Sequence, residues 1–587
     1  MTSDMPNVLP DALTNAAPGA GAPEVSVVVA TYNRGDSVAH LLGQLAGQTL
    51  AAERFEVVVV DDGSTPPVAD RLRALLAPGG VPYRLTVAAQ PNGGPGAARR
   101  HAIARSRGAL LVIVDDDMHV APDFLEQHLA AHADGVPRVV LGPLQPEPGA
   151  RLPLFERLPM ALNRRLVDEV TRGVRPARGT DLYTGNVSLP RAGYDAAGGF
   201  DPALRLSEDL ELGLRLEAAG LRFGVCAGAG AWHASDHTRL TAWMRRSRAY
   251  GAADARVAAK HPEARAADPW RFVFAVHALS RPLLLLAAFA PALARPVAWL
   301  AIRLALVLAA LGLEGAAIAG ATLVYGLQYF AGVRDHAGSR RAAWAGLRRY
   351  LVGAEAAALP PLGRVLKCLA DVAEDHAAIR RSDEKYKATP RPSRLLPDLV
   401  QKVGFQMMAA YRVMRLLRDL RLTLLAKVAS RLIRHLYAAE IHWDAELAPG
   451  VVLVHGTGLV LGHAARVGPG CILFQHVTLG ESIHPESREI GTPTLEADVH
   501  VGPGATLLGP ITLGRGSKVA ANSVLMRSVP AQSLVEPAAV VVRTRRRRPA
   551  PPPPAAPQQA APPRAEPPDA EQSAPDADVP ILAGTGP

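Results

Sequence analysis

Hydrophobic residues in the first 265 positions fall into short, unbroken runs separated by stretches with helical spacing. Residues 25–30, 55–60 and 110–114 are such runs, and each is followed by polar residues. Five or six β-branched and aliphatic residues between turn formers are typical of buried strands. The intervening segments, such as 37–49, repeat apolar residues at helical intervals. Strands and helices in this alternation predict an α/β domain with a parallel sheet.

Polar side chains stand where these predicted strands end. The first run ends in Thr31 and Tyr32, the second is followed by Asp62, and the third by three consecutive aspartates, 115–117. Because the carboxyl ends of parallel strands meet at one edge of a sheet, these groups are expected to line one ligand pocket. Three adjacent carboxylates repel one another unless a cation holds them, and oxygen ligands favour Mg²⁺ or Mn²⁺. On its own, the triplet is also compatible with a solvated acidic turn.

Motifs in a fixed order from residue 27 to residue 215 resemble the family 2 glycosyltransferases, which have the Rossmann-like GT-A fold. The matching segments are 27–33, 59–64, 92–99, 115–117, 185–186, 198–201 and 207–215. Each segment alone is a weak signal, whereas their order and spacing together are specific. The resemblance implies that this domain transfers a sugar from a nucleotide-sugar to a hydroxyl acceptor, with inversion and with a divalent metal ion.

The resemblance also assigns roles to single residues. The implied nucleotide-sugar contacts are Thr31, Tyr32, Asp62, Arg99 and Asp116. The implied metal ligands are Asp115, Asp117 and His233, with His237 as a weaker candidate for the third ligand. Asp209 is the implied general base, with Glu208 beside it, and an inverting transfer does require a carboxylate that accepts the hydroxyl proton. Two alternatives stay open: acidic residues also stabilise a helix N-terminus, and a histidine beside a tryptophan is often packed in a core.

Residues 266–355 form an apolar segment for which the pattern predicts helices. The stretch 304–330 contains 27 residues with a single charge, Glu314, and this length can span a bilayer. Arginines flank the region on both sides, which favours a hairpin that returns to the cytoplasm, either spanning or re-entrant. Because Arg295 and Arg303 lie within the preceding apolar stretch, a buried helical pair in a soluble bundle is the alternative.

From residue 441 the hydrophobic rhythm changes to one residue in six, interrupted by a loop at 481–494. The predicted inward row is Ile441, Leu447, Leu453, Leu459, Ala465, Cys471, Val477, Leu495, Val501, Leu507, Leu513, Val519 and Leu525. Hexapeptide repeats form one short strand on each face of a triangular prism, with an apolar side chain pointing inward at each step. Because the same phase resumes after the loop, the loop is expected to protrude without breaking the stack. The sequence therefore predicts a left-handed parallel β-helix after a helical lead-in.

The β-helix and its lead-in resemble the hexapeptide acyltransferases, and serine O-acetyltransferase in particular. The matching segments are 404–412 in the lead-in, and 454–462 and 477–480 in the repeats. The resemblance implies acetyl-CoA as the donor, a homotrimer, and His455 as the general base on a hydroxyl acceptor. Glu440 stands where the family has the aspartate that orients this base, so a histidine–carboxylate dyad remains available.

Two positions depart from that family. Val454 replaces the aspartate that usually precedes the catalytic histidine, and Thr492 replaces a second histidine that helps to hold serine. The acceptor therefore stays open between serine and a sugar hydroxyl, with His484 in the protruding loop as a substitute for the lost histidine. The alternative for His455 is a histidine that simply faces solvent at a corner of the prism.

Composition and charge narrow the setting. Three cysteines without a close pair argue against disulfides and thiolate metal sites, and no basic segment followed by an apolar one marks a secretory signal. The net charge of +10 comes from arginines beside apolar helices and in the tail, which suits an anionic membrane surface better than nucleic acid. These features predict a cytoplasmic protein that associates with the cytoplasmic membrane.

The expected organisation has seven parts. They are a flexible leader (1–22), the glycosyltransferase domain (23–265), the apolar helical segment (266–355), a linker (356–397), the helical lead-in (398–440), the β-helix (441–545) and a disordered Pro/Ala-rich tail (546–587). The whole predicts a bifunctional transferase of cell-surface polysaccharide synthesis. Two alternatives remain: a serine acetyltransferase of cysteine biosynthesis with an independent glycosyltransferase, and a β-helix that only trimerises the glycosyltransferase.

Overall fold

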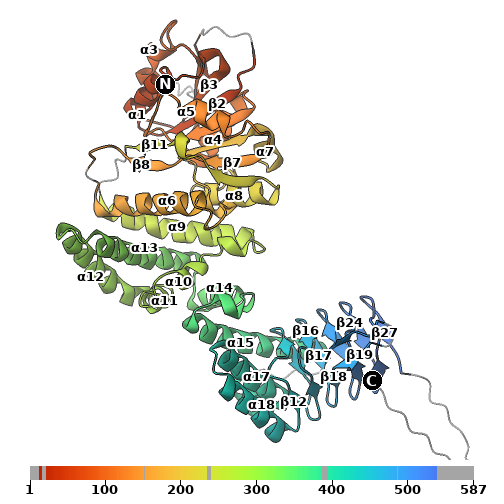
Figure 1. Ribbon diagram of the computed structural model, residues 1–587. Coiled ribbons are helices and arrows are strands. Elements are labelled where there is room, and N and C mark those ends of the chain that lie inside the picture. The colour runs from red at the N-terminus through yellow and green to blue at the C-terminus, as the bar shows by residue number, and fades with distance from the viewer. Residues whose placement is uncertain are drawn as a thin grey trace, which may run out of the picture. The chain divides into compact units, whose positions relative to one another are not determined.

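The computed structural model describes residues 12–15, 21–150, 152–234, 239–384, 394–484 and 487–537, and the helix backbone at 385–386 (Figure 1). The predicted tail, most of the predicted leader, and His237 lie outside these residues. Within the leader, β1 (Leu13–Thr14) pairs antiparallel with β4 (Arg84–Ala89), and the Asn15 side chain bonds to the backbone of Tyr83 and Leu85. The prediction of a flexible leader was therefore wrong for residues 12–15, because Asn15 ties them to the sheet edge.

The first domain is built on an eight-stranded sheet in the order β1-β4-β3-β2-β5-β9-β7-β10. Its other strands are β2 (Val25–Thr31), β3 (Phe55–Asp61), β5 (Leu110–Val114), β7 (Arg138–Leu141), β9 (Asn186–Pro190) and β10 (Arg222–Val225). Strands β4, β3, β2 and β5 are parallel, and β9 is antiparallel to β5. Successive residues enter opposite cores: Val27 and Val29 belong to one, and Val28 to the other. Both faces are covered, which explains the unbroken apolar runs in the sequence.

Helices cover the two faces of this sheet in separate groups (Figure 1). α1 (Gly35–Leu45) and α5 (Phe124–Ala130) contribute to one core, and α4 (Pro95–Arg105), α7 (Arg191–Ala196) and α8 (Glu208–Ala218) to the other. A second sheet has the order β6 (Met118–Val120), β11 (Ala231–His233), β8 (Leu144–Pro146), and it sets His233 opposite Met118. The predicted α/β fold is confirmed.

The apolar segment is helical, as predicted, but its helices begin and end elsewhere. They are α9 (Leu240–Lys260), α10 (Arg271–Ala275), α11 (Arg281–Phe289), α12 (Pro291–Ala310), α13 (Glu314–Ala337) and α14 (Arg340–Val352). The stretch 304–330 was predicted as one span, and this is wrong, because Gly312 turns the chain with a φ of +73° between α12 and α13. By length and composition alone, α12 and α13 are each apolar enough to cross a membrane.

α13 is packed firmly against α9. A Cβ on Gly332 would clash with the Arg248 carbonyl, and one on Gly251 would clash with the Tyr329 carbonyl, so these glycines bring the two backbones together. The Arg248 guanidinium also pairs with Asp335 at 2.5 and 2.8 Å. α13 therefore belongs to the core that continues from the first domain.

The predicted linker at 356–397 is largely a helix, α15 (Pro361–Tyr386), so that prediction was wrong for most of its length. The lead-in continues with α16 (Leu395–Gln401), α17 (Val403–Asp419) and α18 (Thr423–Tyr437). The Asp375 carboxylate, fully buried on α15, accepts bonds from the Arg412 guanidinium on α17 at 2.8 and 3.0 Å and from the Gly450 amide at 2.8 Å. A buried arginine needs such a partner, and this one lies 37 residues earlier.

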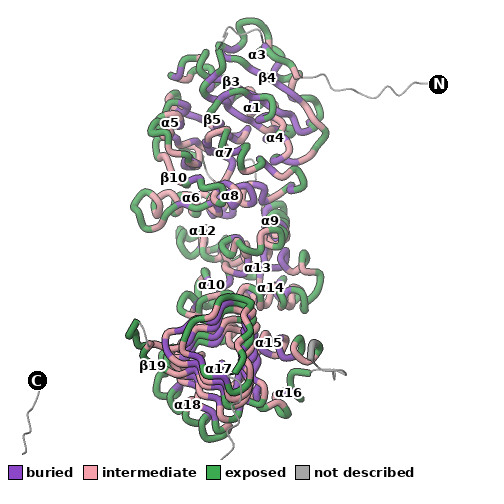
Figure 2. The backbone as a smooth tube through the Cα atoms, turned by 90° about the vertical axis from the view of Figure 1, so that its right-hand side faces the viewer, coloured by how far each residue is buried: buried purple, intermediate pink, exposed green. Residues whose placement is uncertain are grey.

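The C-terminal domain is a parallel β-helix with three ladders of short strands, and Figure 2 shows its coils stacked on one another. One ladder contains β12 (Glu440–Ile441), β15 (Val460–Leu461), β18 (Thr478–Gly480), β23 (Thr506–Leu508) and β26 (Val524–Leu525). The second contains β13 (Glu446–Leu447), β16 (Arg466–Val467), β21 (Thr494–Leu495) and β24 (Thr512–Leu513). The third contains β14 (Val452–Leu453), β17 (Ile472–Leu473), β22 (His500–Val501), β25 (Lys518–Val519) and β27 (Leu534–Val535). The predicted fold is confirmed here as well.

The inward register differs from the predicted one in the middle of the repeats. Strand residues continue from Leu453 to Leu461, a step of eight rather than six, and stack as Leu453 on Leu473 and Leu461 on Leu479. Leu459 is also buried, but it lies at the corner before its strand. The protruding loop then makes a step of sixteen to Leu495. The two added residues and the ten added residues together make two hexapeptides, so the sequence phase resumes although the register has shifted twice.

Candidate active sites

The ends of the central strands meet as predicted, and Arg34 joins two of the three aspartates there. Its guanidinium donates to Asp116 at 3.1 Å and to Asp117 at 2.7 Å. Thr31 is buried at the end of β2, whereas the Tyr32 side chain is half exposed and open to a ligand. Burial raises the pKa of the Asp116 carboxyl to about 6, although Arg34 opposes this shift.

The Asp62 carboxylate is held by the loop after β4. One oxygen accepts from the Gln90 amide and the Gly93 amide, and the other accepts from the Gly94 amide, all at 2.8 Å. Gly94 has a φ of +93°, which lets its N–H turn toward the carboxylate. Asp62 therefore fixes the loop beside the predicted base site.

Arg99 is the centre of the first site. From α4 it donates to the Asp115 carboxylate at 2.7 Å and to the Glu208 carboxylate at 2.9 Å, and it is 6% exposed. Burial disfavours its charge, but the two carboxylates outweigh this effect and hold the pKa of the guanidinium above its usual range. Arg99 thus connects the aspartate triplet to the first turn of α8, although the two are far apart in sequence.

Asp209 follows Glu208 on α8 and carries no ion pair among the described residues. Its burial and the neighbouring Glu208 charge raise the pKa of the Asp209 carboxyl to about 7, which is a suitable value for a general base. Ser207, which caps α8 in the left-handed region with a φ of +59°, donates to the Asp254 carboxylate at 2.6 Å. The Tyr329 hydroxyl of α13 donates to the other oxygen of Asp254 at 2.6 Å. The apolar segment therefore supports the turn that carries Asp209.

His233 lies beside the aspartates, as the resemblance requires of a third ligand. Its Nε2 is 3.3 Å from the Asp117 carboxylate, and although burial opposes it, this contact raises the pKa of the imidazole. Among the described residues no three His, Cys, Asp or Glu side chains are grouped closely enough to hold a metal ion. However, the buried Asp117 Oδ1 has no hydrogen-bond partner in the structure, and two carboxylates and an imidazole are donors that suit a divalent ion. The residue types therefore suit the implied metal, whereas their positions in the described part of the chain do not bring three of them together.

A charge network behind α8 was not foreseen in the sequence. The fully buried Glu211 carboxylate binds Arg215, Lys260 and His261, and against the effect of burial these donors lower its pKa to about 2. Arg215 also donates to the Gly199 carbonyl at 2.6 Å, so the glycine motif is tied to α8. The sequence carried a signal for this, since the acidic residues of 208–211 are followed at a helical spacing of four by an arginine.

His455 lies in the eight-residue step between β14 and β15, at a corner of the β-helix. It is exposed and has a φ of +66°, and Gly456 and Gly458 nearby also have positive φ. They lie in the turn whose step exceeds a hexapeptide by two residues. Glu440, the predicted orienting residue, forms an ion pair with Arg434 of α18, and no hydrogen bond joins it to His455 within the described part of the chain. The dyad therefore stays a prediction.

The lead-in motif attaches the helices to the first coils. Gly404 lets α17 approach the Leu453 carbonyl, and Met407 contacts Gly456 in the His455 turn. The Tyr411 hydroxyl donates to the Ala445 carbonyl at 2.9 Å. The motif therefore acts as a support for the corner that carries His455.

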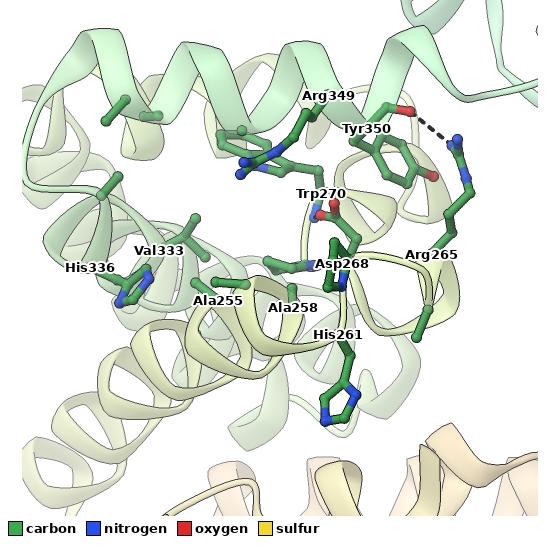
Figure 3. Close-up of a pocket in the computed structure, with 18 of the residues that line it drawn as sticks. Ala255, Ala258, His261, Arg265, Asp268, Trp270, Val333, His336, Arg349 and Tyr350 are labelled. Carbon is green, nitrogen blue, oxygen red and sulfur yellow. Dashed lines mark hydrogen bonds between the residues drawn. The ribbon is translucent and has the colours of Figure 1, made fainter. Parts of the chain in front are cut away.

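A cavity of about 600 Å³ lies apart from both sites, between α9, α13, α14 and the segment 261–270 that precedes α10 (Figure 3). It is lined by Trp270, Val333 and several alanines, and Arg265 at its edge donates to the Tyr350 carbonyl at 2.8 Å. His261 also lines it and reaches the Glu211 network. The cavity contains none of the predicted site residues.

Comparisons with known proteins match the α/β domain and the β-helix domain to two different families. The family model described as "Glycosyl transferase family 2" matches residues 26–176, and the one described as "Glycosyl transferase family group 2" matches residues 110–326. The validoxylamine A glucosyltransferase of Streptomyces hygroscopicus subsp. jinggangensis is 36% identical over 228 residues, which are 35% of this chain and 53% of that protein.

Serine acetyltransferases match the other half. The one from Synechococcus elongatus is 38% identical over 150 residues, 26% of this chain, and the chain spans 61% of its length. The one from Bacillus licheniformis is 33% identical over 163 residues, 27% of this chain and 74% of that protein. The solved serine acetyltransferase of Brucella abortus strain S19 in complex with coenzyme A covers 29% of this chain and 70% of its own, with 28% identity and a TM-score of 0.25. By its C-terminal part the chain belongs to the serine acetyltransferase family, and it carries a family 2 glycosyltransferase domain before it.

Proposed function

We propose that the chain catalyses two transfers, and that the first is inverting glycosyl transfer from a nucleotide-sugar. The arrangement that supports this most strongly is Arg99, which joins Asp115 at the predicted diphosphate site to Glu208 beside the predicted base. In the proposed reaction the acceptor oxygen bonds to the anomeric carbon, and the bond from that carbon to the diphosphate breaks. The hydroxyl proton passes to the Asp209 carboxylate.

Asp115, Asp117 and His233 would hold a divalent ion, Mg²⁺ or Mn²⁺, in this proposal. The ion supplies positive charge that stabilises the departing diphosphate. Tyr32 is exposed at the strand edge and would stack on the nucleotide base, with Thr31, Asp62, Arg99 and Asp116 around it. Binding of Mn²⁺ can be followed by its paramagnetic effect on water protons, and the Asp117→Asn variant should lose it.

The test of the first activity is release of nucleoside diphosphate by purified full-length protein. Asp209→Ala should abolish transfer while leaving nucleotide-sugar binding within about twofold, because a general base contributes roughly 10²–10⁴ in rate. Asp195→Asn, at an exposed position on α7, is the matched control. Retained transfer in Asp209→Ala would remove Asp209 from this role.

The second proposed transfer moves the acetyl group of acetyl-CoA to a hydroxyl. His455 would accept the hydroxyl proton while the oxygen bonds to the thioester carbon. The carbon–sulfur bond then breaks, His455 passes the proton to the departing sulfur, and CoA leaves as the thiol. The relatives favour L-serine as the acceptor. A sugar hydroxyl is the second candidate, because Thr492 replaces the histidine that helps to hold serine and because a glycosyltransferase is fused to the same chain.

Release of CoA separates these acceptors. Turnover with L-serine that is lost in His455→Ala would exclude the sugar proposal, whereas turnover with glycan acceptors alone would support it. Absence of turnover with either acceptor, together with intact trimers, would reduce the β-helix to a scaffold that trimerises the glycosyltransferase. We place the protein at the cytoplasmic face of the membrane in cell-surface polysaccharide synthesis, where a lipid-linked or polysaccharide acceptor would be available.

A further inference from the structure

One face of α12 exposes a continuous stripe of large apolar side chains. Leu300, Leu304 and Val307 recur every three or four residues and are 55–65% exposed. Leu293 continues the stripe toward the N-terminus, and Leu311, directly after the helix, extends it at the other end. Residues at these intervals lie on one side of a helix. A soluble surface rarely carries so many large apolar groups in one patch, so the stripe calls for an occupant.

The opposite face of α12 is already occupied. Ala294, Ala298, Ile302 and Ala305 are buried, and the cores that contain them also contain residues of α11 and α13. Of the 18 consecutive residues that are most apolar in each helix, 22% are buried in α12 and 50% in α13, and α13 is packed against α9. Of these two helices, α12 is therefore the one with an apolar face left to contact something outside the described part of the chain.

The charges around the stripe point to an anionic surface. Residues 278–313 contain three arginines and no acidic residue. Arg295 and Arg303 are exposed and lie four residues on either side of Trp299, and the Arg303 guanidinium is 5.1 Å from the Trp299 ring centroid. Tryptophan and arginine at the edge of an apolar stripe suit the headgroup region of a bilayer, where arginine binds phosphate and its stem covers apolar surface.

We propose that α12 binds the surface of an anionic bilayer and lies in the plane of the interface, with the leucine stripe in the acyl boundary and Arg295 and Arg303 on lipid phosphates. This helix does not span the bilayer, because its other face is fixed on α11 and α13. A second copy of the chain is the weaker occupant, since symmetric pairing of two α12 helices would bring arginines together without any carboxylate. This deepens the proposed location and does not depend on either catalytic activity.

The test is flotation of full-length protein with lipid vesicles. Vesicles of phosphatidylcholine with about 30 mol% phosphatidylglycerol should bind the protein. Binding should weaken with added salt, because salt screens the attraction between the solvated arginines and the lipid phosphates. The double variant Arg295→Gln/Arg303→Gln should bind these vesicles about thirtyfold more weakly, since each arginine near such a surface is worth roughly a factor of five. Its binding to pure phosphatidylcholine should not change.

The triple variant Leu300→Gln/Leu304→Gln/Val307→Gln should lose at least a hundredfold in affinity for both kinds of vesicle, because it removes the buried apolar area. The matched control replaces three exposed apolar residues of α18 in the same way, Leu424→Gln/Val428→Gln/Leu432→Gln, and should float like the wild type. Carbonate at high pH should release the bound protein from the vesicles.

Three results would overturn the proposal. They are wild-type binding by the triple variant, resistance to carbonate extraction, which indicates a spanning helix, and a change of oligomeric state in the triple variant without lipid, which indicates a second copy on the stripe. Flotation measures vesicle binding, whereas the release of nucleoside diphosphate and the release of CoA measure the two transfer activities. A failure of this proposal and a failure of the proposed function therefore give different results.

Discussion

Replacing Arg99 by methionine tests whether the first site is held together by charge. The substitution keeps most of the apolar stem and removes the guanidinium that binds Asp115 at 2.7 Å and Glu208 at 2.9 Å. Glu208 is 6% exposed, so its charge would be left buried and unpaired. Breaking a buried ion pair by removing one partner costs about 3–5 kcal/mol. The first turn of α8 should therefore open far more often than in the wild type.

Hydrogen exchange in the full-length protein measures this opening locally. With 1.4 kcal/mol for each factor of ten, amides in the first turns of α8 should exchange at least a hundredfold faster in Arg99→Met. The positive charge of Arg99 also lowers the pKa of Asp209, so its loss should move the acid limb of glycosyl transfer above its wild-type position near pH 7. Arg105→Met, exposed on the same helix, is the control. If Arg99→Met matches this control in both exchange and pH profile, the bridge does not organise the site.

The remaining predictions concern three other positions. In the wild type, kcat/KM for glycosyl transfer should rise through pH 7, because Asp209 works deprotonated and its pKa is about 7. A flat profile from about pH 5.5 to 8.5 would contradict the role of Asp209 as the base. Asp375→Asn should lower the stability of the β-helix by about 3–5 kcal/mol, because Arg412 loses its buried partner. Urea unfolding followed by circular dichroism measures this, with the exposed Glu384→Gln as the control, and equal stability of the two variants would contradict the prediction. Gly332→Val should separate α13 from α9 and cost about 1–3 kcal/mol or more, whereas Gly315→Val has open space and should be tolerated; equal melting temperatures would refute the close approach.

The strands and the site residues at their ends were predictable because they are local. Each buried run needs only its own residues to be recognised, and the carboxyl ends of parallel strands must meet at one edge. The pairing of Arg99 with Glu208 spans 109 residues, and no local pattern specifies which carboxylate a buried arginine finds. The same holds for the pair of Asp375 and Arg412. α15 was predicted as part of a linker because many of its residues are polar, although it is a helix.

The boundary between the first domain and the apolar segment was also set too sharply. Composition separates 266–355 from the glycosyltransferase domain, because its residues are apolar over long stretches. The structure joins them through Tyr329, whose hydroxyl bonds to Asp254, which in turn accepts from the Ser207 hydroxyl at the start of α8. A tyrosine in an apolar helix is a weak signal in sequence, yet the Tyr329 hydroxyl ties the segment to the turn that carries Asp209.

The β-helix shows how a site can be recognised by a departure from a repeat. A strand centre every six residues stacks each coil on the one below, and any other step must push the chain outward. Between residues 441 and 525 the step departs from six at two places, the protruding loop and the turn from Leu453 to Leu461. His455 lies in that turn, with positive φ at His455, Gly456 and Gly458. Left-handed backbone alone does not mark this turn, because Ala464, Asp498 and Asn522 at other turns of the β-helix also have positive φ. What distinguishes the turn of His455 is its eight-residue step, and this local departure from six is the feature of the repeat that singles out His455 as a candidate.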